Sequence, residues 1–215
     1  MVKKFKPGIT VCIPSIAPRA YLLSRAIHSV SLAADRMALT GVPVQLVVRM
    51  DTEKRGAAVT RQRALEHADT EWVAFLDDDD EMDACHLEDL YDAAQEYSAD
   101  YLWSRFRIGL PGGRFREGPA PLGAGSFDQW NDAQPAQTTV TTLVRTELAL
   151  DVGGFTSNAE TDGDQGATID GQRAGEDWLF TLACRAAGAT FRHVPKVTWT
   201  WHHHASNTSG LPDRW

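Results

Sequence analysis

The fold is decided by the stretch Trp72-Val73-Ala74-Phe75-Leu76-Asp77-Asp78-Asp79-Asp80. Its five leading residues are apolar and rich in β-formers, which is typical of a strand buried on both faces. The four carboxylates follow directly, so we expect them at the C-terminal end of this strand. Ligands bind at that edge of open α/β sheets, and crowded carboxylates repel one another unless a cation joins them. Hard divalent ions prefer oxygen ligands and share them with phosphates, so we predict a metal–phosphate site rather than a solvated acidic turn.

The composition fits an ordinary globular protein. The chain has 215 residues, enough for one domain with a sizeable core, and 43% of them are hydrophobic. Its 29 acidic and 21 basic residues give a formal charge of −8, the wrong sign for a surface that holds a polyanion. We therefore expect a single domain over residues 1–215, with no extended nucleic acid or anionic membrane surface as a partner.

The cysteines and apolar runs bear on the cellular compartment. Cys12, Cys85 and Cys184 are far apart and in no metal-ligand spacing, which fits buried thiols in a reducing compartment. No apolar run approaches the ~20 residues that a membrane helix needs, and the basic N-terminus lacks the apolar stretch of a signal peptide. We expect a cytoplasmic protein without an integral membrane segment.

Strands and helices alternate ahead of the acidic cluster. The expected elements are a strand over 9–13, a helix over 19–39, a strand over 44–48, a short helix over 56–67 and the strand over 72–76. Pro14 is expected to stop the first strand because it has no N–H to donate to a ladder. A strand, a helix and a second strand in this order imply a parallel, right-handed crossover. Asp51 falls just past the second strand.

The elements after the cluster indicate a mixed second half. They are a helix up to about residue 97, a hairpin of 101–108 with 114–116, a weak strand over 138–144, a short helix over 148–155, a helix over 176–187 and a strand over 191–201. Asp83 is expected to cap the first of these helices. Residues 156–175 are long and polar, which is typical of a lid or a disordered segment. The whole pattern predicts an α/β fold with a Rossmann-like, mostly parallel central sheet flanked by helices and a mixed C-terminal part.

Three motifs carry a resemblance to a known family. Arg61-Gln62 precedes the acid-tipped strand, residues 75–80 read Phe-Leu-Asp-Asp-Asp-Asp, and Gly-Gly-Phe at 153–155 precedes Gly-Glu-Asp-Trp at 175–178. In this order and spacing they resemble the family 2 glycosyltransferases of the GT-A fold. That family often has Arg-Asn at the first place, Asp-X-Asp at the second, and Gly-Gly-Phe and Glu-Asp elements around its catalytic base.

The resemblance covers residues 9–81 and 141–209 and implies an activity. It implies an inverting, metal-dependent glycosyltransferase of the hexosyltransferase type, which moves a sugar from a nucleoside-diphosphate sugar to an acceptor hydroxyl. A UDP-sugar is the favoured donor, Mn²⁺ or Mg²⁺ the cofactor, and a protein, glycan or lipid-linked hydroxyl the acceptor. Residues 1–100 would bind the nucleotide and residues 101–215 the acceptor.

The resemblance also implies which residues bind the donor and the metal. The donor-binding set is Pro14, Ser15, Asp51, Arg61, Asp77 and Asp78. Pro14 and Ser15 would lie under the nucleotide, and Asp51 would meet the base. Arg61 would approach the base or the diphosphate, Asp77 would bind the ribose or uracil side, and Asp79 would hold the metal. Because Arg49-Met50-Asp51 leads into a charged, shortened loop, unlike the family's, a simple turn acid stays open for Asp51.

Glu176-Asp177 opens a predicted helix, where acids are also favoured by the helix dipole. Glycosyl transfer needs a carboxylate that takes a proton from the acceptor hydroxyl, and a helix start at a loop boundary is well placed to present one. With the resemblance, we favour Asp177 as the base over a purely capping role, and Glu176 as the residue that orients the acceptor.

The sequence Trp-Thr-Trp-His-His-His ends the last predicted strand at residues 199–204. If strand geometry continues, His202 and His204 share the polar face and His203 the apolar one. The resemblance implies a metal or diphosphate contact for a C-terminal histidine, and His204 is the first choice, followed by His202. An exposed histidine triplet without a role is the alternative.

Three other functions stay open at this point. A nucleotidyltransferase shares such a sheet and an acid-held metal, but would need a Gly-rich, basic loop after the first strand, where residues 15–19 offer one arginine. A non-catalytic nucleotide-sugar-binding module would not need Glu176-Asp177. A metal-dependent phosphohydrolase would use the acids and the histidines as a two-metal site.

Overall fold

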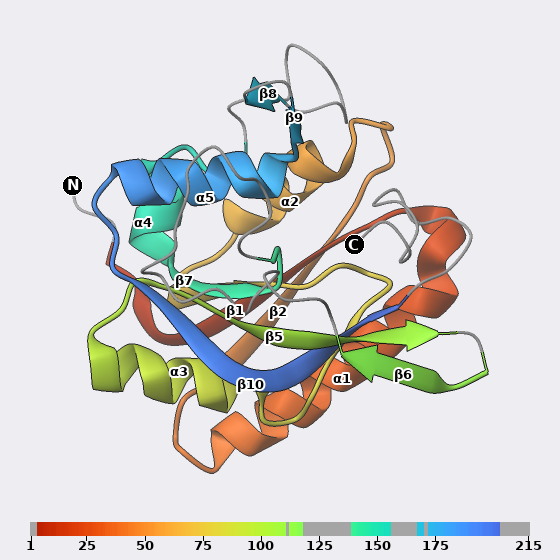
Figure 1. Ribbon diagram of the computed structural model, residues 1–215, viewed down its shortest axis with the longest axis horizontal. Helices are drawn as coiled ribbons and strands as arrows, with labels where there is room; N and C mark the ends of the chain where they lie inside the picture. Colours follow the sequence, from red (N-terminus) through yellow and green to blue (C-terminus); the bar gives the residue numbers. More distant parts are fainter. Residues whose placement is uncertain (1–3, 111, 118–138, 156–166, 170–171, 203–215) are drawn as a thin grey trace.

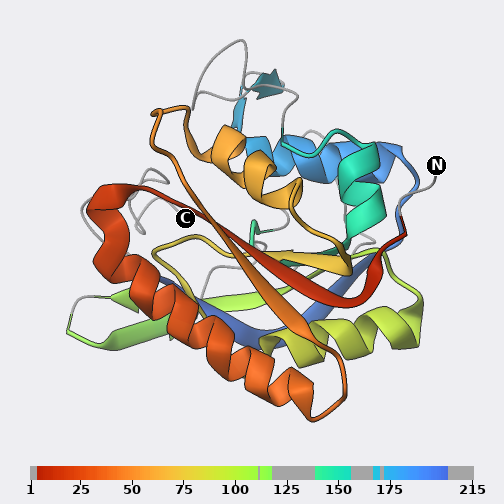
Figure 2. The same cartoon turned by 180° about the vertical axis from the view of Figure 1, so that it is seen from behind.

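Strands and helices alternate through the first half of the chain (Figure 1). The computed structural model describes residues 4–110, 112–117, 139–155, 167–169 and 172–202. The elements of the first half are β1 (Lys6–Ser15), the 3-10 turn η1 (Ala17–Arg19), α1 (Ala20–Ala38), β2 (Val44–Met50), α2 (Ala57–Leu65) and β3 (Thr70–Phe75). Strand β1 pairs in parallel with both β2 and β3, as expected for crossover connections. Helix α1, which connects β1 to β2 along the chain, lies against one face of these strands (Figure 2).

The second half is mixed, as predicted. Its elements are β4 (Glu81–Met82), α3 (His86–Tyr97), β5 (Tyr101–Leu110), β6 (Arg114–Glu117), β7 (Thr142–Arg145), α4 (Thr146–Asp151), β8 (Ala167–Ile169), β9 (Gln172–Ala174), α5 (Glu176–Ala186) and β10 (Phe191–His202). Strand β7 runs antiparallel to β3 and to β5, whereas β10 is parallel to β5. The hairpin expected around Pro-Gly-Gly is β5–β6.

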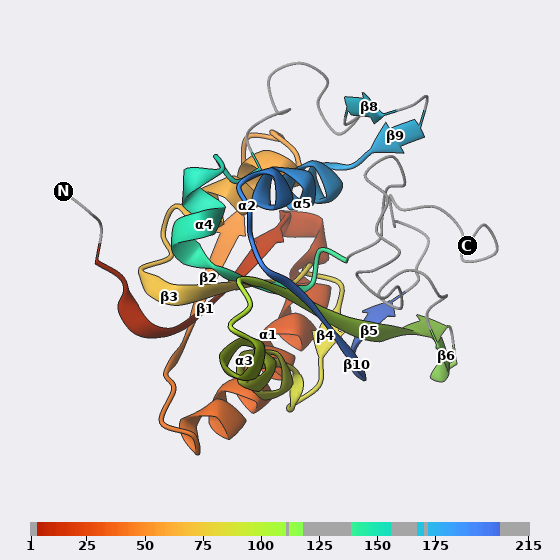
Figure 3. The same cartoon turned by 60° about the vertical axis from the view of Figure 1, so that its left-hand side comes forward.

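The main sheet has the strand order β2-β1-β3-β7-β5-β10-β4 within the described residues, and β6 pairs with β5. Helices α1 and α3 cover one face, and α2, α4 and α5 cover the other (Figures 1 and 3). This arrangement confirms the expected α/β class with a parallel first half flanked by helices. None of the described helices combines the length and apolar character that crossing a membrane requires.

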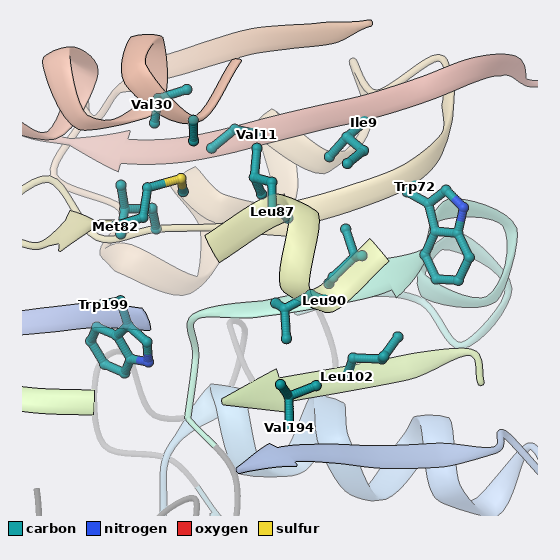
Figure 4. Close-up of a cluster of buried hydrophobic side chains, with 14 of the residues drawn as sticks. Ile9, Val11, Val30, Trp72, Met82, Leu87, Leu90, Leu102, Val194 and Trp199 are labelled. Atoms are coloured by element: carbon teal, nitrogen blue, oxygen red, sulfur yellow. The ribbon is translucent and has the colours of Figure 1, made fainter. Parts of the chain in front are cut away.

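The core lies on both faces of the sheet because alternate residues of a strand point to opposite faces. Trp72, Ala74 and Leu76 join the cluster under α1 and α3, which Figure 4 shows in close-up. Val73 and Phe75 join the second cluster, under α2, α4 and α5. The prediction that residues 72–76 are buried on both faces is therefore confirmed.

Pro14 does not stop the first strand, contrary to the expectation. The Cys12 carbonyl accepts from Leu76 and the Ser15 carbonyl accepts from Asp51, so alternate residues of β1 face β3 and β2. Pro14 therefore faces β3, whose pairing with β1 ends at Cys12 and Phe75. Because β3 no longer pairs with β1 at this point, the missing N–H of Pro14 leaves no carbonyl of β3 without a donor. Strand β1 continues along β2 to Ser15.

Asp83 does not cap α3, contrary to the expectation. It follows the short strand β4. The helix begins at His86 after Cys85, without a side-chain cap. Both carboxylate oxygens of Asp83 instead pair with the guanidinium of Arg107 on β5, and the Asp83 N–H donates to the carbonyl of Thr198 on β10. Asp83 therefore binds residues of β5 and β10 instead of capping α3, the role that the local sequence predicts.

The long polar stretch over residues 156–175 contains regular structure in the part that is described. Strands β8 and β9 form a two-stranded antiparallel hairpin that leads into α5. The expectation of a lid over the rest of this stretch concerns residues outside the described ones.

Candidate functional site

Four consecutive acids stand where the sequence predicts them, directly after β3 and Leu76. The Asp80 N–H donates to the Asp77 carbonyl at 3.2 Å, which turns the chain back on itself. As a result, Asp77, Asp79 and Asp80 each offer a carboxylate oxygen within 4.8 Å of the others. Asp79 and Asp80 are buried, so this acidic cluster is poorly screened by water.

Asp80 carries the strongest signature of this crowding. Burial raises its pKa well above the ordinary range, and the nearby Asp79 and Asp77 raise it further. One of its oxygens accepts from the backbone N–H of His202 at 3.0 Å, which opposes part of that rise. Oxygen-only ligands that repel one another in a low-dielectric site fit a hard divalent cation. Asp80 and Asp77 thus join Asp79 in the cluster, whereas sequence reasoning placed all four acids at this edge but named only Asp79 and the histidines as metal ligands.

Ser15 at the end of β1 and Arg19 in the 3-10 turn η1 flank the cluster. The Ser15 hydroxyl donates to Asp78 Oδ2 at 2.6 Å. Arg19 Nη1 donates to Asp78 Oδ1 and to Asp79 Oδ2, both at 3.1 Å. The structure thus brings Ser15, Asp78 and Asp79 together, with Pro14 beside them in β1. Sequence reasoning weighed Arg19 only as a triphosphate ligand and missed it as a counter-charge.

Arg25 and His202 meet at a neighbouring acid, Glu81. Arg25 donates to the Asp79 carbonyl at 2.6 Å, and its Nε lies 3.3 Å from Glu81. His202 Nε2 is 2.9 Å from the Glu81 carboxylate. The imidazole therefore lies against Glu81, and the backbone N–H of His202 donates to Asp80 in the cluster. The role of the His202 ring as a metal ligand stays a prediction. His204 lies outside the described residues.

Gly109 explains how the His202 ring fits against β5. A Cβ at this glycine would lie 2.7 Å from His202 Nδ1, closer than real side chains approach. The glycine in β5 therefore leaves the space that lets the imidazole turn toward Glu81.

Arg61 joins the acidic cluster to the start of α5. Its Nη2 donates to Asp77 Oδ1 and its Nη1 to Glu176 Oε1, both at 2.7 Å. The guanidinium carbon lies 5.1 Å from the centre of the Phe155 ring, and the side chain is only 4% exposed. Three of the sequence motifs thus meet at one side chain.

Gln62, the neighbour of Arg61 on α2, holds the Gly-Gly-Phe motif. Its Oε1 accepts from the Phe155 N–H at 3.0 Å. Gly154 has φ +59, and a Cβ there would lie 2.0 Å from the same Oε1. A glycine is therefore required both by the left-handed backbone and by the close approach of Gln62.

Glu176 and Asp177 begin α5, but their pKa values are shifted in opposite directions. Burial alone would raise the pKa of Glu176, but the charge and hydrogen bond of Arg61 lower it below its usual range. Burial raises the pKa of Asp177 to about 6, and the Glu176 charge adds to that rise, while Arg61 opposes it. Asp177 Oδ1 also accepts from the Trp178 N–H at 2.8 Å. A carboxyl group with a pKa near neutrality is suited to general-base chemistry.

Asp51 lies just past β2 and closes the turn that leads into α2. Its two oxygens accept from the backbone N–H groups of Arg55 at 2.9 Å and Gly56 at 2.8 Å. Burial would raise the pKa of Asp51, but these backbone hydrogen bonds hold it below its ordinary value. These contacts are those of a turn acid, the alternative left open by the sequence, and a contact with the base stays a prediction.

Comparison with known protein families identifies a match. The family model described as "Glycosyl transferase family 2" matches residues 38–148, more than half of the chain. No curated protein matches it. The crystal structure of S. aureus TarS 1-349 is similar, with 16% identity, a TM-score of 0.61, and coverage of 91% of this chain and 60% of that one.

Two further TarS structures are similar. The complex of TarS 1-349 with UDP-GlcNAc has 15% identity and a TM-score of 0.63, and the match covers 95% of this chain and 61% of that one. A longer TarS structure has 17% identity and a TM-score of 0.62, covering 91% of this chain and 37% of that one. This chain thus spans about three fifths or less of their lengths, and the likeness concerns the fold. From the family match and this fold, the chain belongs to glycosyl transferase family 2 and has the GT-A fold.

Proposed function

We propose that this protein is an inverting glycosyltransferase that moves a sugar from a nucleoside-diphosphate sugar to an acceptor hydroxyl. The observation that carries the proposal is that Arg61 connects two chemically different groups of acids. On one side lies the buried acidic cluster at the end of β3, and on the other lies Asp177, a carboxyl group whose pKa is about 6. Family membership supports the same reaction.

The donor would be a UDP-sugar bound at the edge of the sheet where β1, β2 and β3 end. TarS, which has a similar fold, was crystallised with UDP-GlcNAc. Pro14, Ser15 and the acids after β3 would line the nucleotide site, with Asp51 at the base. Residues 1–100 would then form the donor half, and residues 101–215, which contain α5, the acceptor half.

A divalent cation, Mn²⁺ or Mg²⁺, would be held by Asp79 together with Asp77 and Asp80. When bound, such an ion neutralises charge on the leaving diphosphate. The three acids fit it through their oxygen donors, their proximity and the raised pKa of Asp80. His204 and His202 remain proposed as further ligands, and the His202 ring would have to leave Glu81 to reach the cluster.

Asp177 would act as the general base. Above pH 6 its carboxylate is mostly ionised and accepts the proton of the acceptor hydroxyl. The acceptor oxygen then forms a bond to the anomeric carbon as the bond from that carbon to the diphosphate oxygen breaks, and the electron pair leaves with the diphosphate. Attack from the face opposite the leaving group inverts the configuration. Glu176, kept ionised by Arg61, would orient the acceptor hydroxyl, which belongs to a protein, a glycan or a lipid-linked sugar.

A donor screen with a stereochemical readout tests this function. Purified protein is incubated with UDP-sugars, GDP-sugars and dTDP-sugars, with and without Mn²⁺, and release of the nucleoside diphosphate is measured. We expect Mn²⁺-dependent UDP release, and an α-linked donor should first yield the β-anomer of the free sugar when water is the acceptor, as followed by NMR. Retention of configuration, or hydrolysis of the nucleotide at its phosphates, would contradict the proposal.

A further inference from the structure

We propose that Arg61 is a positioning residue that locks the donor half to the base-bearing helix, and that it does not itself bind the donor. The inference rests on the proposed function and deepens it, since it names what sets the distance between donor and base. It also replaces the donor contact that the family resemblance implies for this arginine.

The first support is that each terminal nitrogen of the Arg61 guanidinium donates to a different carboxylate. A guanidinium presents its N–H groups in a fixed plane, so two carboxylates bound to it are held at a defined separation. Here Nη2 is bound to Asp77 after β3, and Nη1 to Glu176 at the start of α5. These acids come from the two halves of the chain, and the side chain between them is buried.

The second support is that Arg61 is itself held in place. Its guanidinium lies over the Phe155 ring, and that ring packs against Phe75 at 4.9 Å and Phe180 at 4.5 Å between ring centres. The neighbouring Gln62 binds the Phe155 backbone. Arg61 therefore stands on packed side chains of β3 and α5, and an approach to a donor phosphate would break the two ion pairs of a buried guanidinium. Removing one partner of such a pair is strongly unfavourable.

The third support is the charge that Arg61 brings to the acceptor half. The charged groups that face Asp177 are Glu176 and Asp77, which raise its pKa, and Arg61, which lowers it. Arg61 thus keeps Glu176 ionised, and it offsets part of the rise that burial and the Glu176 charge cause in the pKa of Asp177. Because a misplacement of about 1 Å between reacting groups costs roughly 10²-fold in rate, a tether between the two halves affects turnover more than binding.

A double-mutant cycle tests the tether. Arg61→Gln, Glu176→Gln and the double variant are compared for hydrolysis of UDP-GlcNAc with Mn²⁺, and the Kd of UDP is measured by calorimetry. We expect Arg61→Gln to lower kcat by roughly 10–100-fold while the Kd of UDP changes less than about threefold. In the Glu176→Gln background the same change should cost much less, because the tether is already broken.

Two more variants separate positioning from charge and from folding. Arg61→Lys keeps the charge but lacks the planar fork, so it should recover less than a tenth of the lost kcat. Arg63→Gln is the matched control, because Arg63 lies on the same helix in an exposed pair with Glu53; it should leave kcat and Kd unchanged. The acid limb of the kcat–pH profile should move to higher pH in Arg61→Gln and stay in place in Arg63→Gln.

The outcomes distinguish the tether from the function itself. A rise of tenfold or more in the Kd of UDP for Arg61→Gln, with additive effects on kcat, would make Arg61 a donor ligand and overturn this inference alone. If Arg61→Gln does not fold, Arg61→Lys is compared with the wild type instead. A wild-type kcat in Arg61→Lys would then overturn the tether. A wild-type protein that binds UDP but releases none from any UDP-sugar would overturn the proposed function, and the inference with it.

Discussion

Replacement of Asp177 by asparagine should make the folded protein more stable at neutral pH. Burial, followed by the Glu176 charge, raises the pKa of this carboxyl from 3.8 to about 6, so its ionised form opposes folding. The penalty is absent below about pH 3.8 and complete above about pH 6. A rise of that size corresponds to about 3 kcal/mol at pH 7.5, which Asp177→Asn would remove. For a chain of this length the gain would raise Tm by roughly 6–12 °C.

Urea unfolding of the wild type and Asp177→Asn between pH 4 and pH 8 measures this effect. The difference in unfolding free energy should be near zero at pH 4 and grow to its full value by pH 7.5. Glu176→Gln is the matched comparison with the opposite sign, because Arg61 lowers the pKa of Glu176 and the ionised form of this residue stabilises the fold. Glu176→Gln should therefore destabilise the protein at pH 7.5. A stability difference for Asp177→Asn that does not change with pH would refute this reasoning.

Three further predictions concern the surroundings of the site. Arg19→Gln should bind Mn²⁺ more tightly than the wild type without nucleotide, because Arg19 pairs with the buried Asp79; unchanged affinity by EPR titration would count against it. Burial lowers the pKa of His86 from 6.5 to about 4, so wild-type stability should fall by up to about 3 kcal/mol as the pH drops from 6.5 through 4, and His86→Gln should flatten that loss in urea titrations. Gly154→Ala should destabilise the fold by roughly 1–3 kcal/mol more than Gly112→Ala, which also has positive φ but open space around it; equal losses in urea unfolding would show that the close contact is unimportant.

Local pattern was enough to predict β3, the strand that carries the acids. Residues 72–76 are apolar without interruption, and such a run is buried on both faces wherever the chain places it. The acids that follow must then lie at the edge of the sheet. The same holds for α1, whose apolar repeat gave its extent to within one residue at each end.

Predictions failed where a distant neighbour decides the outcome. Pro14 was expected to end β1, but the end of β3 on that side makes its missing N–H harmless. Asp83 has the local chemistry of a helix cap, yet Arg107 binds its carboxylate from β5. Neither neighbour is visible in the residues around Pro14 or Asp83.

The acids of the site could be found from the sequence, but their partners could not. Asp177 was selected from its place at a helix start together with the family resemblance, and its raised pKa arises from burial that only the packed fold provides. Arg61 and Glu176 lie 115 residues apart in the chain, and the sequence motifs around them give no sign that they pair. The contact between Arg19 and Asp79 could not be predicted either, because the two residues lie 60 residues apart in the chain.

The central claim is that Asp177 takes the proton in a sugar transfer from a nucleoside-diphosphate donor. The most direct test is the kcat for UDP release from UDP-GlcNAc by Asp177→Asn and by the wild type, at equal folded fraction and with the Kd of UDP measured on both. The account predicts a Kd within about threefold and a kcat lower by roughly 10²–10⁴-fold, the usual contribution of general acid–base catalysis. Near-normal kcat with unchanged UDP binding would contradict it.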